Sequence, residues 1–362
     1  MVGLAMLSFC YALLMRSLQM TRWHEEAELV EVEDPVPGPG QVVVKVGGAG
    51  ACHSDLHMMH GSGDNVPFSL PFTLGHETAG WVHTVGSGVT GLELGQPVAV
   101  YGAWGCGTCP RCSDGTENYC EDMPGLGAGP GLGMDGGMAD YLLVPAARHL
   151  LPLPEGLTPA QAAPLVDAGL TPYHAVHRSL AKLGATSTAV VIGVGGLGHL
   201  AVQILKATSA AQVIAVDTRA QALELARSSG ADLAITAGDA AAGEIRAATG
   251  GRGADVVLDF VGLDSTLALA ASCARMLGDV TVVGVGGGTL PFSFLRPAYE
   301  VSVQSVYWGT RPELADVLAL AARGLLRAET TTYPLDQALD AYRSLADGKI
   351  VGRAVIVPAL VA

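Results

Sequence analysis

The chain has 362 residues, 49% of them hydrophobic and 15% charged, and its 34 acidic and 20 basic residues give a formal net charge of -14. The length indicates about two domains. A surface this acidic repels nucleic acid and anionic membranes, so we expect neither as a partner and predict a small-molecule substrate instead.

The N-terminal segment, residues 1–14, is almost entirely apolar. It is shorter than the about 20 residues of a membrane span, and it lacks the basic start of a signal peptide. Residues 16–23 alternate as the first strand of a domain would. We therefore expect an extension or a mis-assigned start, with Met15 as the biological start. A short membrane-surface anchor is the alternative.

The first half of the chain is predicted to be β-rich. Prolines and glycines in residues 35–40 form a turn before a strand at 41–46, and short strands are expected at 97–101 and 141–144 between glycine-rich turns. Thr158 and Pro159 together predict a helix N-terminus, and broken helical pieces follow it.

From residue 189 strands and helices alternate, which predicts a parallel, doubly wound sheet. The expected strands are 189–192, 213–216, 233–235, 256–260, 280–285 and 301–306. The expected helices are 196–209, 219–229 and 265–277, the last one capped by Asp264. Helices at 312–323 and 335–345 and a strand at 354–357 lie beyond this sheet, and we expect them to rejoin the first domain.

Residues 50–61 concentrate groups that bind metals or move protons: Cys52, His53, Ser54, Asp55, His57 and His60. They follow the strand at 41–46, where the chain is expected to turn or to begin a helix. If 54–60 is helical, the three histidines share one face, which makes a second metal there an alternative. We expect instead that His53 meets the pyrophosphate of a cofactor and that His60 is a surface residue.

A G-x-G-x-x-G pattern lies between an expected strand and an expected helix, at Gly193, Gly195, Gly196, Leu197 and Gly198. Such a loop brings the backbone and a helix N-terminus to a pyrophosphate, although a turn used only for packing is the alternative. Asp217 ends the next strand, where its carboxylate can bind ribose hydroxyls and repel a 2′-phosphate. The predicted cofactor is therefore NAD rather than NADP. Arg219 lies close enough in the sequence to weaken this preference.

Four of the seven cysteines lie together, at Cys106, Cys109, Cys112 and Cys120. The odd count and the clustering indicate metal chemistry in a reducing compartment, and hence a cytoplasmic protein, rather than a disulfide framework. Four thiolates at these spacings can close a tetrahedron around one zinc ion and leave no open position, so this zinc is expected to be structural. An iron-sulfur cluster or free thiols are the alternatives.

A catalytic zinc needs three protein ligands and an open position, and Cys52 and His76, with its neighbour Glu77, are candidates. The motifs Cys-His-Ser-Asp at Cys52 and Gly-His-Glu at Gly75, the four cysteines and the nucleotide loop occur in the order of a known family. From about Met15 onward the chain resembles the zinc-dependent alcohol dehydrogenases of the medium-chain dehydrogenase/reductase superfamily, most closely the bacterial NAD-dependent secondary-alcohol branch.

The resemblance implies an α/β fold, with a GroES-like β-rich catalytic domain and a Rossmann domain built on a doubly wound parallel sheet. The catalytic domain would span residues 15–172, the Rossmann domain 173–306, and 307–362 would return to the catalytic domain. By analogy with the family we also expect a homo-oligomer, either a tetramer or a dimer.

The resemblance further makes Cys52 and His76 ligands of the catalytic zinc. Asp167 stands where many relatives have a cysteine as the third ligand. Glu77 would lie behind the metal and could replace Asp167 as the resting ligand. Asp55 would orient the His76 ring, as groups behind a metal-bound imidazole often do. Each chain would thus hold two zinc ions, one catalytic and one structural, together with NAD.

The expected reaction is reversible oxidation of an alcohol to a ketone or aldehyde by hydride transfer. Ser54 and His57 would pass the proton of the alcohol to solvent, and Thr171 would contact the nicotinamide. The family's substrate pocket would be lined by His57 and by the apolar side chains of Phe68, Leu132 and Trp308, which suits hydrophobic secondary or aryl-substituted alcohols. Trp308 could equally belong to the core or to a subunit interface. A polyol or formaldehyde-type dehydrogenase and a catalytically silent NAD(H)-binding protein are the alternative functions.

Overall fold

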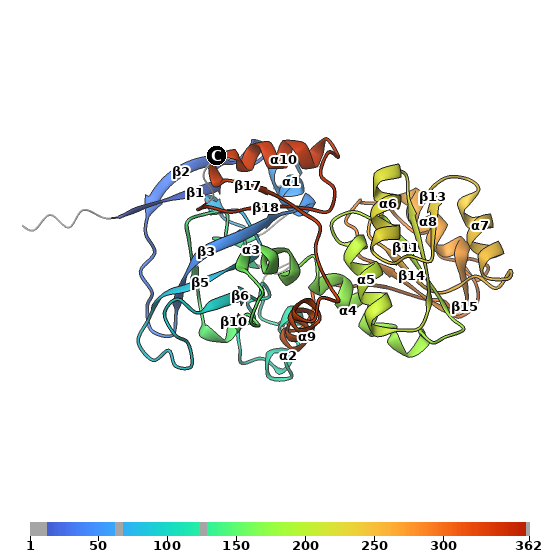
Figure 1. Cartoon of the computed structure of the whole chain (residues 1–362), viewed down its shortest axis with the longest axis horizontal. Coiled ribbons are helices and arrows are strands. Elements are labelled where there is room, and N and C mark those ends of the chain that lie inside the picture. Colours follow the sequence, from blue (N-terminus) through green and yellow to red (C-terminus); the bar gives the residue numbers. More distant parts are fainter. Residues whose placement is uncertain (1–12, 62–67, 124–128, 360–362) are drawn as a thin grey trace, which may run out of the picture.

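The computed structural model describes residues 13–61, 68–123 and 129–359. The expectation of an extension or mis-assigned start in residues 1–14 therefore lies outside the described residues, except for Leu13 and Leu14. The strand expected from residue 16 is β1 (Leu14–Met20), and the Leu13 carbonyl already accepts a hydrogen bond from Asp34 N. Figure 1 shows two bodies side by side, one built mainly of long strands and the other of alternating strands and helices.

The first body contains a seven-stranded sheet with the order β10-β6-β5-β3-β18-β17, in which β9 also pairs with β3. Its strands are β3 (Val42–Ala51), β5 (Glu77–Val85), β6 (Pro97–Val100), β9 (Tyr141–Val144), β10 (Leu150–Pro152), β17 (Thr330–Tyr333) and β18 (Arg353–Ile356). A three-stranded sheet joins β1 to β2 (Glu28–Glu33) and β4 (Phe72–Thr73), and β7 (Gly129–Pro130) pairs with β8 (Gly133–Met134). The last strand of the chain thus lies inside the first body, directly beside β3.

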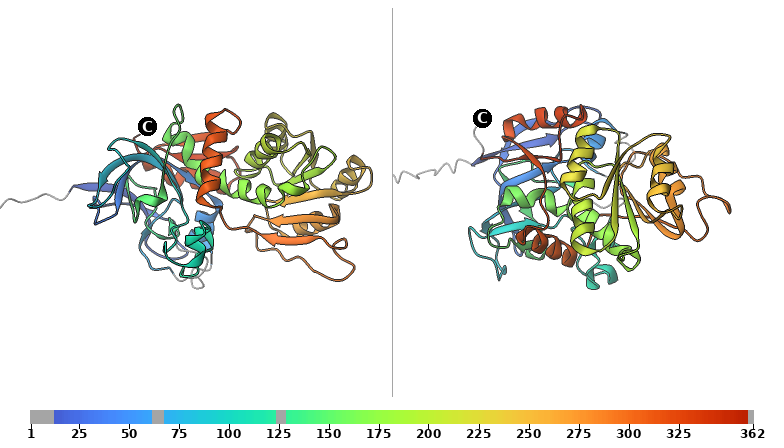
Figure 2. Two further views of the ribbon diagram at one scale, coloured as in Figure 1. Left: turned by 90° about the horizontal axis from the view of Figure 1, so that it is seen from below. Right: turned by 45° about the vertical axis from the view of Figure 1, so that its right-hand side comes forward.

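The second body is a six-stranded parallel sheet with the order β13-β12-β11-β14-β15-β16, which confirms the predicted doubly wound arrangement. Its strands are β11 (Thr188–Ile192), β12 (Gln212–Asp217), β13 (Leu233–Thr236), β14 (Ala254–Asp259), β15 (Ala274–Val282) and β16 (Ser302–Ser305). Helices α5 (Gly198–Thr208), α6 (Ala220–Ser228), α7 (Ala241–Ala248) and α8 (Asp264–Cys273) lie on its two faces (Figure 2).

Two details of the prediction for this sheet are wrong. The helix expected to reach residue 277 ends at Cys273, because β15 begins at Ala274 and pairs with β14. Asp264 is the first helical residue and does not cap the helix, since its carboxylate accepts a hydrogen bond from Thr289 N at 2.6 Å and Leu263 is the N-cap.

The remaining helices cover the first body or connect the two. They are α1 (His53–His60), α2 (Pro110–Ser113), α3 (Pro159–Ala162), α4 (Leu170–Arg178), α9 (Arg311–Ala322) and α10 (Ala338–Ala346). The 3-10 helices are Glu117–Tyr119, Ala147–His149, Ala163–Val166, Leu180–Lys182 and Leu335–Gln337. Helix α4 contacts both α5 and α9, so it joins the second body to the first. None of the helices in the described ranges has the length and apolar character needed to cross a bilayer.

Apolar side chains form separate cores on the two faces of the parallel sheet. Val191 and Val213 pack against α4, α5 and the Val317 side chain of α9, whereas Val190 and Ile214 pack against residues of α7 and α8. Burial of both faces explains why these strands are nearly uninterrupted hydrophobic runs, the pattern from which they were predicted.

Candidate active site

The stretch at residues 50–61 begins where β3 ends. Cys52 has an extended backbone and is the N-cap of α1, so of the turn or helix left open by the sequence the structure has a helix. The Asp55 carboxylate accepts a hydrogen bond from the backbone N–H of Cys52 at 3.0 Å, which fixes the turn from strand to helix. The Cys52 side chain is buried at this junction, with its Sγ 3.6 Å from the Ser54 hydroxyl.

Four buried side chains, those of Cys52, His76, Glu77 and Asp167, bring one ligand atom each to within 4.8 Å of the others. The antiparallel pairing of β3 with β5 sets Gly50 opposite Glu77 and thereby brings His76 to Cys52. Asp167 follows the 3-10 helix before α4, and its Oδ2 lies 3.5 Å from His76 Nε2. Three of these sulfur, imidazole and carboxylate donors can hold a zinc ion and leave its fourth position for substrate.

Asp55 holds the His76 ring from behind. Asp55 Oδ1 lies 3.1 Å from His76 Nδ1, while Oδ2 accepts a hydrogen bond from the Tyr342 hydroxyl at 2.8 Å. A proton on Nδ1 leaves the Nε2 lone pair free to face Asp167 and Cys52. Tyr342, on α10, was missed by the sequence analysis, because in a helix with an apolar face a tyrosine indicates only packing.

Glu77 is fully buried and forms an ion pair with Arg353 at the start of β18. Burial raises the pKa of Glu77 to about 8, although the Arg353 guanidinium opposes this rise. A side chain at Gly50 would collide with the Glu77 carboxylate, so the glycine makes room for it. Arg353 was also missed by the sequence analysis, since only the pairing of β18 with β3 reveals its position.

Two of the other ligand candidates, Cys52 and Asp167, are influenced by the same neighbouring charges. Burial raises the pKa of the Cys52 thiol, but Arg353 and His76 outweigh burial and bring this pKa to about 7. Burial also raises the pKa of Asp167, and hydrogen bonds from His76 and Thr171 reverse this effect and lower it. The Thr171 hydroxyl donates to Asp167 Oδ1 at 2.8 Å. The Cys52 thiol is therefore brought close to ionisation at neutral pH, and the Asp167 carboxyl is anionic there, as metal binding requires.

The four clustered cysteines come together as predicted. Their sulfur atoms all lie within 4.8 Å of one another, with Cys106 and Cys112 3.9 Å apart and Cys109 and Cys120 3.8 Å apart. Backbone N–H groups also point at the sulfurs, for example Cys109 N at 3.2 Å from Cys106 Sγ. Such donors stabilise thiolates, so this group fits a structural zinc ion with four protein ligands.

A cavity of about 490 Å³ separates the two bodies beside the zinc ligands. Its walls include Cys52, His53, Ser54, His57, Gly193, Gly195, Gly196, Leu197, Gly198, Asp217, Arg219 and Arg353. The loop before α5 is tightly wound, because Gly193 has φ 85° and a side chain at Gly198 would collide with the Gly193 carbonyl. The predicted coenzyme loop and the dense stretch at 50–61 therefore face one another across a single cavity.

The Asp217 carboxylate lies at the edge of this cavity and is already hydrogen-bonded. Oδ2 accepts from Val194 N at 2.8 Å, and Oδ1 accepts from Arg219 N at 2.9 Å. Arg219 Nε also reaches Asp217 Oδ1, at 3.4 Å. Asp217, which was expected to favour NAD, and Arg219, which was expected to weaken that preference, are thus paired with each other.

His60 is separated from His53 and His57, since it lines a different cavity, of about 220 Å³, between α1 and α10. Within the described residues, the three histidines of α1 do not form a group of ligand atoms close enough to share a metal. The alternative of a second metal on this helix face is therefore not supported.

The expected pocket residues Phe68, Leu132 and Trp308 do not line the cavity between the bodies. They lie beside the segments that follow the cysteine cluster: a side chain at Gly133 would collide with the Phe68 ring, and one at Gly129 would reach the Trp308 ring at 3.1 Å. Leu132 packs against the same apolar cluster as Trp308.

Comparisons with known proteins agree with this geometry. The family model "Alcohol dehydrogenase GroES-like domain" matches residues 38–155, and the model "Zinc-binding dehydrogenase" matches residues 196–323. The NAD-dependent alcohol dehydrogenase of Sulfurisphaera tokodaii is 37% identical, over 95% of this chain and 100% of the relative.

Solved structures are equally similar. The alcohol dehydrogenase of Aeropyrum pernix superposes with a TM-score of 0.88 at 35% identity, covering 95% of this chain and 100% of that one. Acetophenone reductase from Geotrichum candidum, solved in complex with NAD, gives a TM-score of 0.82 at 32% identity, covering 95% of this chain and 97% of that one.

Proposed function

We propose a substrate class for this chain, which belongs to the zinc-dependent alcohol dehydrogenases of the medium-chain dehydrogenase/reductase superfamily and couples alcohol oxidation to NAD. Its proposed substrates are hydrophobic secondary or aryl-substituted alcohols and their ketones. The observation that carries this proposal is the apolar set of Phe68, Leu132 and Trp308, together with the glycines that leave room for the Phe68 and Trp308 rings. The similarity to an acetophenone reductase supports the same substrate class.

Cys52, His76 and Asp167 are the proposed ligands of the catalytic zinc. Glu77 is the weaker candidate for the resting site, because its carboxylate is paired with Arg353, whereas Asp167 Oδ2 is turned toward His76 Nε2. When bound, the zinc polarises the alcohol and lowers its pKa. The role of Glu77 would then be to approach the metal during ligand exchange.

Ser54 and His57 are proposed to remove the proton of the alcohol. Both line the cavity, and the Ser54 hydroxyl lies next to Cys52 Sγ, so it can accept a proton released at the zinc site. His57 follows one turn later on α1 and can deliver that proton to solvent, since an imidazole ring can accept a proton on one nitrogen and release one from the other. Three parts of the NAD cofactor are assigned to different residues. His53 and the loop at 193–198 are proposed to hold the pyrophosphate, and Thr171 is proposed to contact the nicotinamide. Asp217 is proposed to bind the ribose and thereby to select NAD over NADP.

The division into a catalytic domain at 15–172 and 307–362 and a Rossmann domain at 173–306 is also a proposal, supported by the membership of the two large sheets. A homo-oligomer is supported by the unpaired edge of β16 and by exposed apolar side chains near it, among them Met276, Phe292, Phe294, Leu295 and Val303. A cytoplasmic location is supported by the six described cysteines, which are all free thiols.

The test uses purified full-length protein, which should contain about two zinc ions per chain and reduce NAD with 1-phenylethanol. Cys52→Ala should abolish turnover and lose about one zinc ion, whereas Cys273→Ala, in a buried cysteine far from either cluster, should keep both metals and activity. About one zinc per chain and no turnover with any alcohol of a panel would refute the proposal. Faster turnover of polyols would favour the alternative dehydrogenase.

A further inference from the structure

Trp308 has an unusual backbone conformation. Its φ of 49° lies in the left-handed region, which a bulky residue without glycine's freedom avoids unless its surroundings impose it. Such strained residues persist only where neighbouring contacts over-determine them, and they concentrate at functional sites. The contacts that hold this residue therefore indicate what fixes its side chain.

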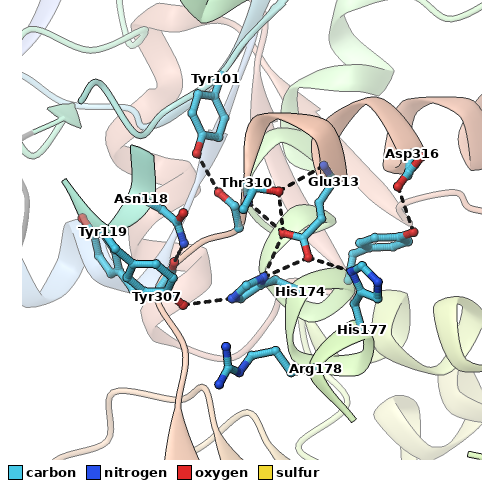
Figure 3. A network of polar contacts seen from close by, with 12 residues as sticks. Tyr101, Asn118, Tyr119, His174, His177, Arg178, Tyr307, Thr310, Glu313 and Asp316 are labelled. Carbon is cyan, nitrogen blue, oxygen red and sulfur yellow. Dashed lines mark hydrogen bonds and ion pairs between the residues drawn. The ribbon is translucent and has the colours of Figure 1, made fainter. Parts of the chain in front are cut away.

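Both neighbours of Trp308 are held through their carbonyl oxygens. Asn118 Nδ2 donates to the Tyr307 carbonyl at 2.9 Å, and the Tyr101 hydroxyl donates to the Gly309 carbonyl at 2.7 Å. Figure 3 shows Tyr101 and Asn118 approaching the same stretch of chain. Because the two bonds lie on either side of Trp308, together they set the direction in which its side chain leaves the backbone.

One of these donors belongs to the segment that carries the four clustered cysteines, residues 106–120, which we call the zinc lobe, and the other precedes it. Asn118 lies in the 3-10 helix of the lobe, next to Tyr119 and Cys120, and Tyr101 follows β6 directly, before the lobe. Asn118 and Tyr101 are buried, and Asn118 Oδ1 has no hydrogen-bond partner. The amide nitrogen of Asn118 thus makes the contact with Tyr307, while its amide oxygen has no hydrogen-bond partner within the described residues.

The indole ring is seated against the two ends of the zinc lobe. A Cβ atom at Gly102, before the lobe, would lie 2.5 Å from Trp308 Cη2, and one at Gly129, after it, would lie 3.1 Å from the same atom. The absence of side chains at these glycines lets the ring lie flat against the backbone. The lobe, through Asn118, and the residues that flank it, Tyr101, Gly102 and Gly129, therefore fix both the backbone and the ring of Trp308.

We propose that the zinc lobe positions the substrate pocket: Asn118 and Tyr101 hold the strained turn at Trp308, and so determine how large an alcohol substituent the enzyme accepts. The structural zinc would then influence selectivity by keeping Asn118 in place. This inference rests on the proposed function, in which Trp308 is a wall of the pocket.

The experiment compares kcat/KM for 1-phenylethanol with kcat/KM for 2-propanol in Asn118→Ala, Tyr101→Phe and Trp308→Ala. Loss of either hydrogen bond should change the ratio by about fivefold or more, in the direction given by Trp308→Ala. Combining Asn118→Ala with Trp308→Ala should add no further change in the ratio, because both act through the same ring.

Tyr173→Phe is the control. The Tyr173 hydroxyl donates to the Asp316 carboxylate at 3.2 Å, on the exposed side of α4 and α9 and away from the turn at Trp308. This variant should keep the parental ratio. Zinc content and thermal stability are measured for each variant, and Tyr101→Phe decides the question if Asn118→Ala loses zinc or fails to fold.

An unchanged ratio in a zinc-loaded Asn118→Ala and in Tyr101→Phe would overturn the inference, as would an equal change in Tyr173→Phe. The proposed function fails separately, if the parent enzyme oxidises neither alcohol. A parent that is active on both, with a ratio insensitive to these variants, would refute the positioning role alone.

Discussion

Replacing Tyr342 by Phe removes a single hydroxyl behind the catalytic zinc site. That hydroxyl donates at 2.8 Å to Asp55, whose other oxygen faces His76. Asp55 is 0% exposed and Tyr342 is 2% exposed, so water cannot easily replace the lost donor. Asp55 Oδ2 would keep only the bond from Cys52 N.

The expected effect follows from the charge and burial of Asp55. A hydrogen bond to a charged group contributes about 1.5–3 kcal/mol. Each 1.4 kcal/mol corresponds to a factor of about ten in an equilibrium constant. Loss of a group that orients a zinc-bound histidine typically costs about 10–100-fold in metal affinity. We therefore expect the zinc affinity of Tyr342→Phe to fall by about 10–100-fold. The turnover number should fall as well, because a less firmly held His76 positions the metal less well.

The assay follows transfer of zinc to a chromogenic chelator. In Tyr342→Phe one zinc per chain should leave markedly faster than in the parent, while the second, at the four cysteines, leaves at the parental rate. The control is Tyr333→Phe, a half-buried tyrosine on β17 whose hydroxyl has no hydrogen bond within the described residues. Retention of the catalytic zinc within about twofold of the parent in Tyr342→Phe would refute this reasoning.

Three further predictions concern other contacts. Arg353→Leu leaves the buried Glu77 unpaired and should lower the free energy of unfolding by about 3–5 kcal/mol, as measured by denaturant titration. The control Arg343→Leu breaks an exposed ion pair and should lower this free energy by at most about 1 kcal/mol. Asp217→Ser should raise kcat/KM with NADP relative to NAD by at least about tenfold; an unchanged ratio would contradict the assigned role. Burial lowers the pKa of His199 from its ordinary value of 6.5 to about 4. Between these two pH values His199 is protonated in the unfolded chain but neutral in the folded chain. Stability should therefore fall as pH drops from about 6.5 to about 4, and melting curves should show a shallower fall in His199→Gln.

The sequence analysis succeeded where the chemistry is local. The four clustered cysteines and the loop at 193–198 are each contained in a short segment, so residue type and spacing alone indicate what they bind. The parallel sheet was equally accessible, because strands buried on both faces are apolar runs separated by helices. Bringing Asp167 to Cys52 and His76 required the family resemblance.

Other features depend on contacts between distant parts of the chain. Tyr342 and Asp55 are 287 residues apart, and Arg353 and Glu77 are 276 residues apart. Neither Tyr342 nor Arg353 stands in a motif, so only the folded chain reveals their partners. The strand at 274–277 was mistaken for helix because its residues continue an alanine-rich and leucine-rich helix without a break, and pairing with β14 outweighs that local preference.

The place of β18 beside β3 has a consequence for biosynthesis. On the ribosome, β9 can pair with residues 42–45 of β3 once residues 141–144 are made, but the edge of β3 at residues 49–51 stays open until residues 354–356 arrive. The parallel sheet, whose strands are all made before residue 306, can fold during that interval. Because Arg353 and Tyr342 come with the final segment, the nascent chain can assemble the four-cysteine site long before it can complete the catalytic one.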